Sequence, residues 1–404
     1  MLIHRLKASG FLSFGPGGID LPMEPLNVLI GPNGSGKSNL LEAIALLKAA
    51  PRSISEPISR LGGVREWLWK GPAAPDSFTV ETLIDYPPGG VLRHTLTLAD
   101  RNDRPEVTSE RVEPSETHTN ERAALSYYRP PREERTEIYL REKSPNPTDP
   151  NAVGSLLAHF LGDGVHFRSD FLPKASLVSI ANPQDYPALW YLNGQYEAIR
   201  LYRDWLFGPS TELRQPASAH DPADFLNERG TNLAPVLSNF PGENKRQLIT
   251  ALQKLYDGIV DIKCSVIGGT VALFLEEDGN REIPVSRLSD GTLRYLCLLA
   301  ILLHPEPPPL VVIEEPELGL HPDLLPTLAD LLLAASERSQ LIVTTHSDVL
   351  VDALTETPES VVVCEKHAGQ TEMRRLDKDD LAKWLKVYTL GNLWSSGQLG
   401  GNRW

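Results

Sequence analysis

One short segment of the sequence has the residue types and the spacing of a phosphate-binding loop. Residues 31–38 read Gly-Pro-Asn-Gly-Ser-Gly-Lys-Ser, which is a complete P-loop pattern. Its glycines let backbone N–H groups turn toward phosphate oxygens, and the helix expected after it adds the positive end of its dipole. The pattern predicts that Lys37 reaches the β- and γ-phosphates of a nucleotide and that the Ser38 hydroxyl ligates Mg²⁺. The loop residues predicted to hold the nucleotide are Gly31, Asn33, Gly34, Ser35, Gly36, Lys37 and Ser38.

Two adjacent carboxylates follow an apolar run at residues 310–313. A buried strand that ends in this way is the Walker B arrangement, in which one carboxylate holds the metal through water and the next polarises the attacking water. By register, Glu314 takes the metal role and Glu315, just before Pro316, takes the role of the base. An acidic strand end that only faces solvent is the alternative, and the presence of the P-loop disfavours it.

Two further segments could contact a nucleotide from other elements. Ser289 and Gly291 precede an apolar run that predicts a helix, and the N-terminus of a helix binds anions. His346 follows the apolar run 341–343, and ligands of parallel sheets bind at the carboxyl ends of strands. We therefore predict that His346 senses the γ-phosphate. The alternatives are an ordinary helix cap for Ser289 and a structural role for His346.

The elements around these motifs predict an α/β protein with a P-loop core. Apolar spacing predicts a strand at 26–30 and a helix at 39–50, and alternating runs predict antiparallel strands from about 76 to 143. A proline-rich linker follows at 144–151, then a mainly helical stretch, and strands alternate with helices after 261. The predicted domains are 1–143 (P-loop and antiparallel β lobe), 144–260 (mainly helical insertion) and 261–404 (Ser289, Glu314 and His346).

The composition of the 404 residues is that of a globular protein, with 41% hydrophobic and 23% charged residues. No apolar run approaches the ~18 residues that cross a bilayer, and the first residues lack the pattern of a signal peptide, so we expect a cytoplasmic protein without a membrane partner. The three cysteines have no metal-ligand spacing and are expected to be reduced core residues. The formal charge of −14 disfavours a broadly basic surface but leaves room for a local basic groove.

Taken together, these motifs resemble the ABC-type ATPase superfamily and, within it, the SMC and RecF branch. The resemblance is carried by residues 1–48 and 285–367. Asn39 after the P-loop is typical of SMC-like proteins and is a further predicted nucleotide contact, whereas transporter subunits usually have threonine there. The long stretch between Lys37 and Ser289 contains no heptad run, so the chain is similar to a compact RecF-like head rather than to an SMC protein with a coiled-coil arm.

The resemblance implies ATP and Mg²⁺ as cofactors and a homodimer that forms on ATP binding. Each P-loop would face Ser289 and Gly291 of the other copy, and hydrolysis would open the dimer, as in a switch used in DNA maintenance or phage defence. Duplex DNA or a separate effector protein would be the partner. The alternatives are a nucleotide-binding subunit of an ABC transporter, an ATP-dependent regulator of a separate effector, and a module that binds ATP without turnover.

Three positions depart from the family pattern. No glutamine occurs before Gln184, so the usual Q-loop residue is missing from its place after the P-loop. Glu314 replaces the usual Walker B aspartate and is one methylene longer. His321 stands where transporter subunits carry the aspartate of the D-loop, which leaves the usual contact across the dimer open.

Overall fold

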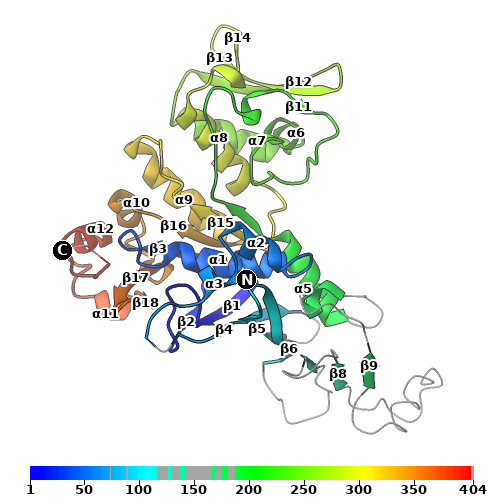
Figure 1. The fold of residues 1–404 in the computed structure, drawn as a ribbon. Helices are drawn as coiled ribbons and strands as arrows, with labels where there is room; N and C mark the ends of the chain where they lie inside the picture. Colours follow the sequence, from blue (N-terminus) through cyan, green and yellow to red (C-terminus); the bar gives the residue numbers. More distant parts are fainter. Residues whose placement is uncertain are drawn as a thin grey trace, which may run out of the picture. The chain divides into compact units, whose positions relative to one another are not determined.

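The computed structural model describes residues 1–72, 74–87, 90–115, 126–129, 137–141, 165–168, 175–180 and 187–401. The chain forms two compact units, each assembled from separated parts of the sequence. Figure 1 shows the helices and strands, coloured along the chain from the N-terminus to the C-terminus. Unit 1 consists of Met1–Met23, Asn33–Ala198 and Cys364–Arg374, and unit 2 consists of Glu24–Pro32, Ile199–Val363 and Arg375–Trp404. The predicted linker at 144–151 and Gln184 lie outside the described residues.

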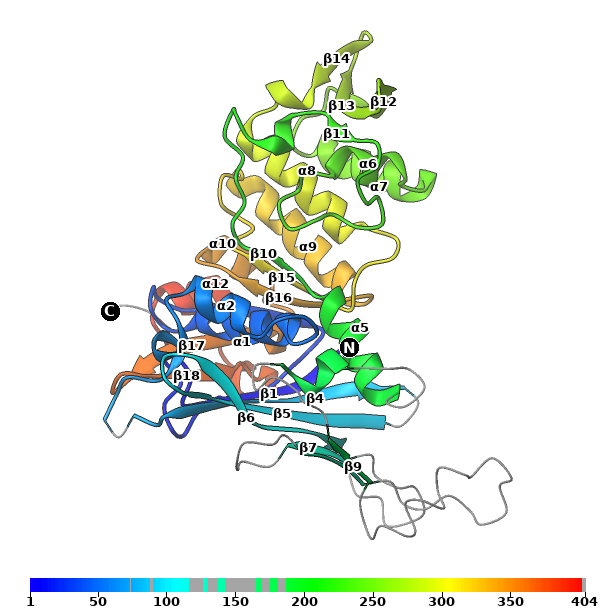
Figure 2. The same ribbon diagram turned by 45° about the vertical axis from the view of Figure 1, so that its right-hand side comes forward.

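Unit 1 is built on an antiparallel sheet in the strand order β2-β1-β4-β5-β6-β7-β8-β9. Buried and half-buried residues alternate along β4 and β5, because successive side chains of a strand point to opposite faces. Figure 2 shows β1, β4, β5 and β6 side by side. The strands are β1 (Ile3–Ser9), β2 (Ile19–Pro22), β4 (Ser77–Tyr86), β5 (Gly90–Asp100), β6 (Pro105–Pro114), β7 (Ser126–Arg129), β8 (Glu137–Arg141) and β9 (Val165–Arg168).

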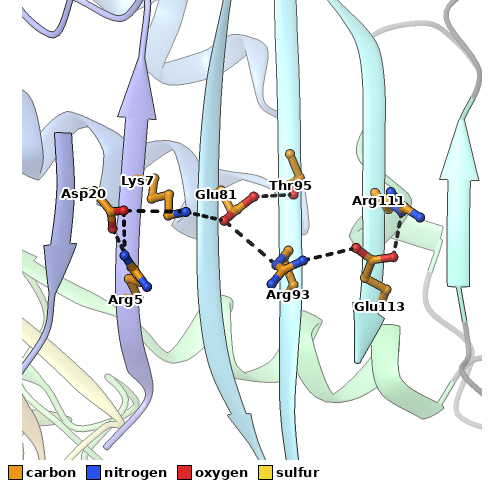
Figure 3. Close-up of polar contacts among 8 residues, drawn as sticks. All are labelled: Arg5, Lys7, Asp20, Glu81, Arg93, Thr95, Arg111 and Glu113. Carbon is orange, nitrogen blue, oxygen red and sulfur yellow. Dashed lines mark hydrogen bonds and ion pairs between the residues drawn. The ribbon is translucent and has the colours of Figure 1, made fainter. Parts of the chain in front are cut away.

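One face of this sheet carries a row of paired charges (Figure 3). Lys7 on β1 lies between Asp20 (3.6 Å) and Glu81 (3.5 Å), and Arg93 on β5 lies between Glu81 (3.9 Å) and Glu113 (3.7 Å). Arg5 and Arg111 end the row with bonds to Asp20 and Glu113, and Thr95 donates to Glu81. Because carboxylates alternate with the cations, this described part of the face, from β2 to β6, has no continuous basic surface.

Helices of unit 1 pack on the sheet through both apolar and polar contacts. These helices are α1 (Lys37–Ala49), α2 (Ser55–Arg60), α3 (Val64–Trp67) and α5 (Pro187–Ala198), and α1 packs against both α2 and α5. A fully buried polar cluster fixes α5. The Tyr196 hydroxyl lies 2.8 Å from Nδ1 of His94, whose Nε2 lies 3.0 Å from Glu110. Burial raises the pKa of Tyr196 well above its ordinary value, so this hydroxyl stays protonated.

Unit 2 contains a sheet in the order β10-β15-β16-β3-β17-β18, of which the last two strands continue into unit 1. Neighbouring strands from β10 to β17 pair in parallel. β3 and β16 are buried along their whole length, as expected of parallel strands covered on both faces. The strands are β3 (Leu26–Ile30), β10 (Arg200–Tyr202), β15 (Leu310–Glu314), β16 (Gln340–Thr344), β17 (Val361–His367) and β18 (Gln370–Arg375).

The remaining elements of unit 2 build its apolar core around α8 (Asp290–Leu302), which is buried from Tyr295 to Leu302. α9 (Leu325–Ser336) packs against both α8 and β16. A second, antiparallel sheet adds β11 (Ala217–Ser218), β12 (Ile259–Ile267), β13 (Thr270–Glu277) and β14 (Arg281–Pro284). The other helices are α6 (Leu233–Ser238), α7 (Gly242–Gln253), α10 (Asp348–Asp352), α11 (Lys378–Leu381) and α12 (Leu390–Ser395).

The predicted α/β fold class with an antiparallel β lobe is confirmed. The strand expected at 26–30 is β3, and the helix expected at 39–50 is α1, which begins two residues earlier. The predicted boundaries at 143 and 260 remain predictions. In the part of the chain that the structure describes, no helix is both long and apolar enough to span a membrane.

Candidate functional site

The P-loop has the backbone of an anion-binding turn. Gly31, Gly34 and Gly36 have φ values of 145°, 79° and 103°, a region that favours glycine. Gly36 is the N-cap of α1 and no side chain caps that helix, while a methyl group on Gly34 would meet no atom within 4 Å. The buried Oγ of Ser35 is among the side-chain atoms without a hydrogen-bond partner in the described chain. An uncapped helix end beside a buried donor fits a phosphate group.

Lys37 is held at the start of α1 with 7% of its surface exposed. Burial raises the pKa of the Cys364 thiol to about 12, and the charge of Lys37 opposes part of this rise. At this position the Lys37 ammonium lies beside the N-terminal end of the helix, where a bound phosphate would also be placed. The phosphate contact of Lys37 stays a prediction.

A series of hydrogen bonds between hydroxyl and amide groups supports the P-loop through the Ser35 carbonyl. The Asn39 amide donates to Oγ of Ser13, which lies 2.6 Å from Oγ1 of Thr371, and Thr371 donates to the Ser35 carbonyl at 2.8 Å. The side chain of Asn39 is thus committed to the support of the loop. Ser13 and Thr371 could not be predicted from the sequence, because no local motif joins two residues so far apart in the chain.

Glu315 and His346 come together in unit 2, at the carboxyl ends of the neighbouring strands β15 and β16. Oε1 of Glu315 lies 3.7 Å from Nε2 of His346, and about a third of each side chain is exposed. Glu315 has a φ of 47°, a left-handed conformation that is unfavourable for a non-glycine residue. Its N–H donates to the Thr344 carbonyl at 3.0 Å, which holds the turn. Such strain points to a functional position.

Glu314 has an arginine as its neighbour. Residues 200–202 of β10 pair with residues 311–313 of β15, so Arg203 follows beside Glu314 at the same edge of the sheet. Nε of Arg203 donates to Oε2 of Glu314 at 3.0 Å, and the two side chains are 22% and 23% exposed. Arg203 could not be predicted from the sequence, because only the pairing of β10 with β15 brings it to this carboxylate.

Glu317 connects the loop after β15 to the end of β16. Its Oε1 accepts hydrogen bonds from Oγ1 of Thr345 (2.6 Å) and from the backbone N–H of His346 (2.8 Å). Glu317 therefore fixes the backbone that presents His346. The signal in the sequence was the third glutamate of the 314–317 segment, which was not assigned a role.

Ser289 is the N-cap of α8, and its predicted contact with a nucleotide stays a prediction. Its Oγ accepts a hydrogen bond from the Thr292 N–H at 3.0 Å. Gly291 packs against the loop after β15, where a methyl group would overlap the carbonyl oxygen of Gly319. Arg294 of the same helix donates to the Leu318 carbonyl at 3.0 Å. The start of α8 is thereby joined to the loop that follows Glu315.

His321, which departs from the family pattern, makes a local hydrogen bond in the structure. Its Nδ1 accepts a bond from the Asp323 N–H at 3.3 Å, and the ring caps the 3₁₀ turn Pro322–Leu324. With 68% of its side chain exposed, His321 remains accessible at the surface of unit 2.

The predicted site residues fall into two sets. Asn33 to Asn39 lie in unit 1, whereas Gly31, Ser289, Gly291, Glu314, Glu315 and His346 lie in unit 2. No group of three or more His, Cys, Asp or Glu side chains that could hold a metal is found among the described residues. Mg²⁺ in nucleotide sites is commonly held by one or two protein groups together with substrate phosphates, and Ser38 and Glu314 are groups of this kind.

Known proteins resemble this chain in family and in fold. The family described as "AAA domain, putative AbiEii toxin, Type IV TA system" matches residues 26–352. Among solved structures, the chain resembles an Smc head bound to the C-winged helix domain of ScpA, with 15% identity, a TM-score of 0.56 and coverage of 94% of this chain and 99% of that one. It also resembles an Smc head with an extended coiled coil, bound to the C-terminal domain of ScpA from Pyrococcus furiosus. Here the sequence identity is 16%, the TM-score is 0.51, and the match covers 95% of this chain and 98% of that one. The chain thus has a fold like that of Smc head domains.

Proposed function

This chain belongs to the AAA-domain family of P-loop ATPases, and we propose that it hydrolyses ATP with Mg²⁺ and uses the cycle as a switch. The observation that carries the proposal is the pairing of Glu315 with His346 at the ends of adjacent strands. A carboxylate with a strained backbone, next to an imidazole, has the groups needed to orient a water molecule and to respond to a phosphate.

Each side chain has a defined task in this proposal. The P-loop N–H groups and Lys37 bind the phosphates, while Ser38 and Glu314 hold Mg²⁺, which offsets phosphate charge when bound. Glu315 accepts a proton from the attacking water, and His346 donates a hydrogen bond to the γ-phosphate. Ser13 and Thr371 keep the loop in shape through the Ser35 carbonyl.

Measurement of phosphate release and nucleotide affinity tests the activity. Lys37→Ala should weaken binding and turnover together, because it removes the charge on the phosphates. Glu315→Gln should bind ATP as the wild type does and release almost no phosphate, because the amide keeps the shape of the side chain and loses the base. Phosphate release that survives both changes would show that the activity belongs to a contaminant.

We further propose that ATP joins two copies of the chain, with each P-loop facing Ser289 and Gly291 of the other copy. The N-terminus of α8 offers backbone donors and a positive dipole end to a γ-phosphate. Glu315→Gln protein should therefore form dimers with ATP and monomers with ADP in size-exclusion chromatography coupled to light scattering. Monomers under both conditions would contradict the sandwich.

The proposed cellular use is DNA maintenance or phage defence, with duplex DNA or a separate effector protein as the partner. A protein partner is supported by the two solved Smc heads described above, each of which is bound to a domain of ScpA. A pull-down with Glu315→Gln protein held in the ATP state would capture either kind of partner.

A further inference from the structure

We propose that Arg203 is the resident counter-ion of Glu314, which excludes free divalent cations from this carboxylate and makes metal binding depend on bound nucleotide. The inference rests on the proposed metal role of Glu314. It adds that a residue outside the sequence motifs regulates metal binding there. It starts from the 3.0 Å bond between Nε of Arg203 and Oε2 of Glu314.

The position of Arg203 is fixed by the strand before it. Within β10, the Leu201 N–H donates to Oε1 of Glu228 at 2.6 Å, and the buried Tyr202 hydroxyl donates to the Leu226 carbonyl at 2.5 Å. The parallel pairing of Tyr202 with Ile313 then sets residue 203 level with residue 314. The strand pairing therefore fixes the position of Arg203 beside this carboxylate.

Arg203 and a metal ion would compete for the same carboxylate of Glu314. Glu314 is only 23% exposed, so its charge is costly to bury without a cation, and Arg203 supplies one. A divalent ion arriving alone must compete with the guanidinium and is also repelled by it. A metal that arrives on a nucleotide brings phosphate charge, which offsets the repulsion and gives the displaced guanidinium new acceptors. Arg203 thus acts as a positioning residue for the metal site.

The test measures Mn²⁺ binding by electron paramagnetic resonance, with and without a non-hydrolysable ATP analogue. Without nucleotide, the wild type should bind Mn²⁺ weakly, and Arg203→Gln should bind it about tenfold more tightly or better, since one repelling charge is gone. Adding Glu314→Gln should abolish that gain. Arg203→Lys keeps the charge and should resemble the wild type. Arg200→Gln, which removes a charge from the other end of β10, is the matched control and should change nothing.

An unchanged Mn²⁺ affinity in Arg203→Gln protein would overturn the inference. If that variant does not fold, the wild type and Glu314→Gln decide the question. Glu314→Gln should leave nucleotide-free Mn²⁺ affinity as it is and weaken Mn²⁺ binding with nucleotide. A loss of nucleotide-free affinity would show that metal reaches Glu314 past Arg203. No effect of Glu314→Gln with nucleotide present would instead contradict the metal role of Glu314 in the proposed function.

Discussion

Glu315, His346 and Glu317 show how single side chains share the work at the ends of β15 and β16. Glu315 adopts a φ of 47° and faces His346 at 3.7 Å, while Glu317 holds the backbone of His346 at 2.8 Å. A group with a chemical task is thus supported by a neighbour that has a structural one. Substitution of Glu317 tests the structural role.

Glu317→Ala should lower the free energy of unfolding by about 1–3 kcal/mol, because Thr345 and the His346 N–H lose their acceptor. Nucleotide turnover should fall as well, since His346 is no longer held. Glu317→Gln keeps one acceptor oxygen and should retain most of the stability. Urea denaturation gives the measurement, with the exposed Glu337→Ala as control. A Glu317→Ala protein as stable as the control would contradict the role assigned to these bonds.

At the scale of elements, the start of α8 and the loop after β15 behave as one structural feature. Gly291 packs on the carbonyl of Gly319, and Arg294 donates to the carbonyl of Leu318 at 3.0 Å. The Arg294 guanidinium also lies over the rings of Trp205 and Phe207, at 5.6 and 5.5 Å from their centroids. Burial lowers the pKa of Arg294 from its usual value, though an arginine remains charged. A movement of the loop after Glu315 would therefore be transmitted to the start of α8 through these contacts.

Gly291→Ala should disturb this junction, because the added methyl group would overlap a backbone oxygen that has no flexible side chain to yield. We expect a loss of about 1–3 kcal/mol in the free energy of unfolding and a lower rate of phosphate release, with nucleotide affinity retained. Gly208→Ala is the matched control, since a methyl group there meets no atom within 4 Å. Equal stability and turnover of the two variants would show that the contact is dispensable.

For the whole molecule, the proposal requires two copies to complete each nucleotide site. Ser289→Arg should bind nucleotide and fail to hydrolyse it, because the cation would fill the phosphate site of the other copy. Mixed with Lys37→Ala protein, it forms dimers in which one site has an intact P-loop and an intact Ser289. Phosphate release should then recover in part. No recovery in a verified mixed dimer would contradict independent composite sites.

Duplex DNA should bind the ATP-bound Glu315→Gln dimer and raise the turnover of the wild type. The formal charge is −14, and the charges in Figure 3 alternate in sign, so the described row from β2 to β6 offers no broad basic face. In this prediction, a basic face for DNA forms when two copies meet. Affinity should fall by roughly 0.9 log units per log unit of salt for each phosphate contact. Fluorescence anisotropy at about 50 and about 200 mM salt tests this. Flat titrations, with turnover indifferent to DNA, would favour a protein effector.

The sequence by itself determined the chemistry-bearing segments and the fold class. A P-loop is recognisable because its glycines, lysine and serine lie close together in the sequence. β3 and β15 are recognisable because buried parallel strands are nearly continuous apolar runs, interrupted in β3 by Asn27. The pairing of strands was not predictable in this way. β10 lies far from β15 in the chain, and its contact with β15 alone brings Arg203 to Glu314.

Only the tertiary structure decided which side chains support the motifs. Ser13 and Thr371 reach the P-loop from distant segments, and the buried contact of His94 with Tyr196 fixes α5 to the sheet of unit 1. Such contacts depend on packing between elements, which leaves no local pattern of spacing. Motif residues meet backbone requirements within a few positions, whereas supporting residues meet requirements that exist only after folding.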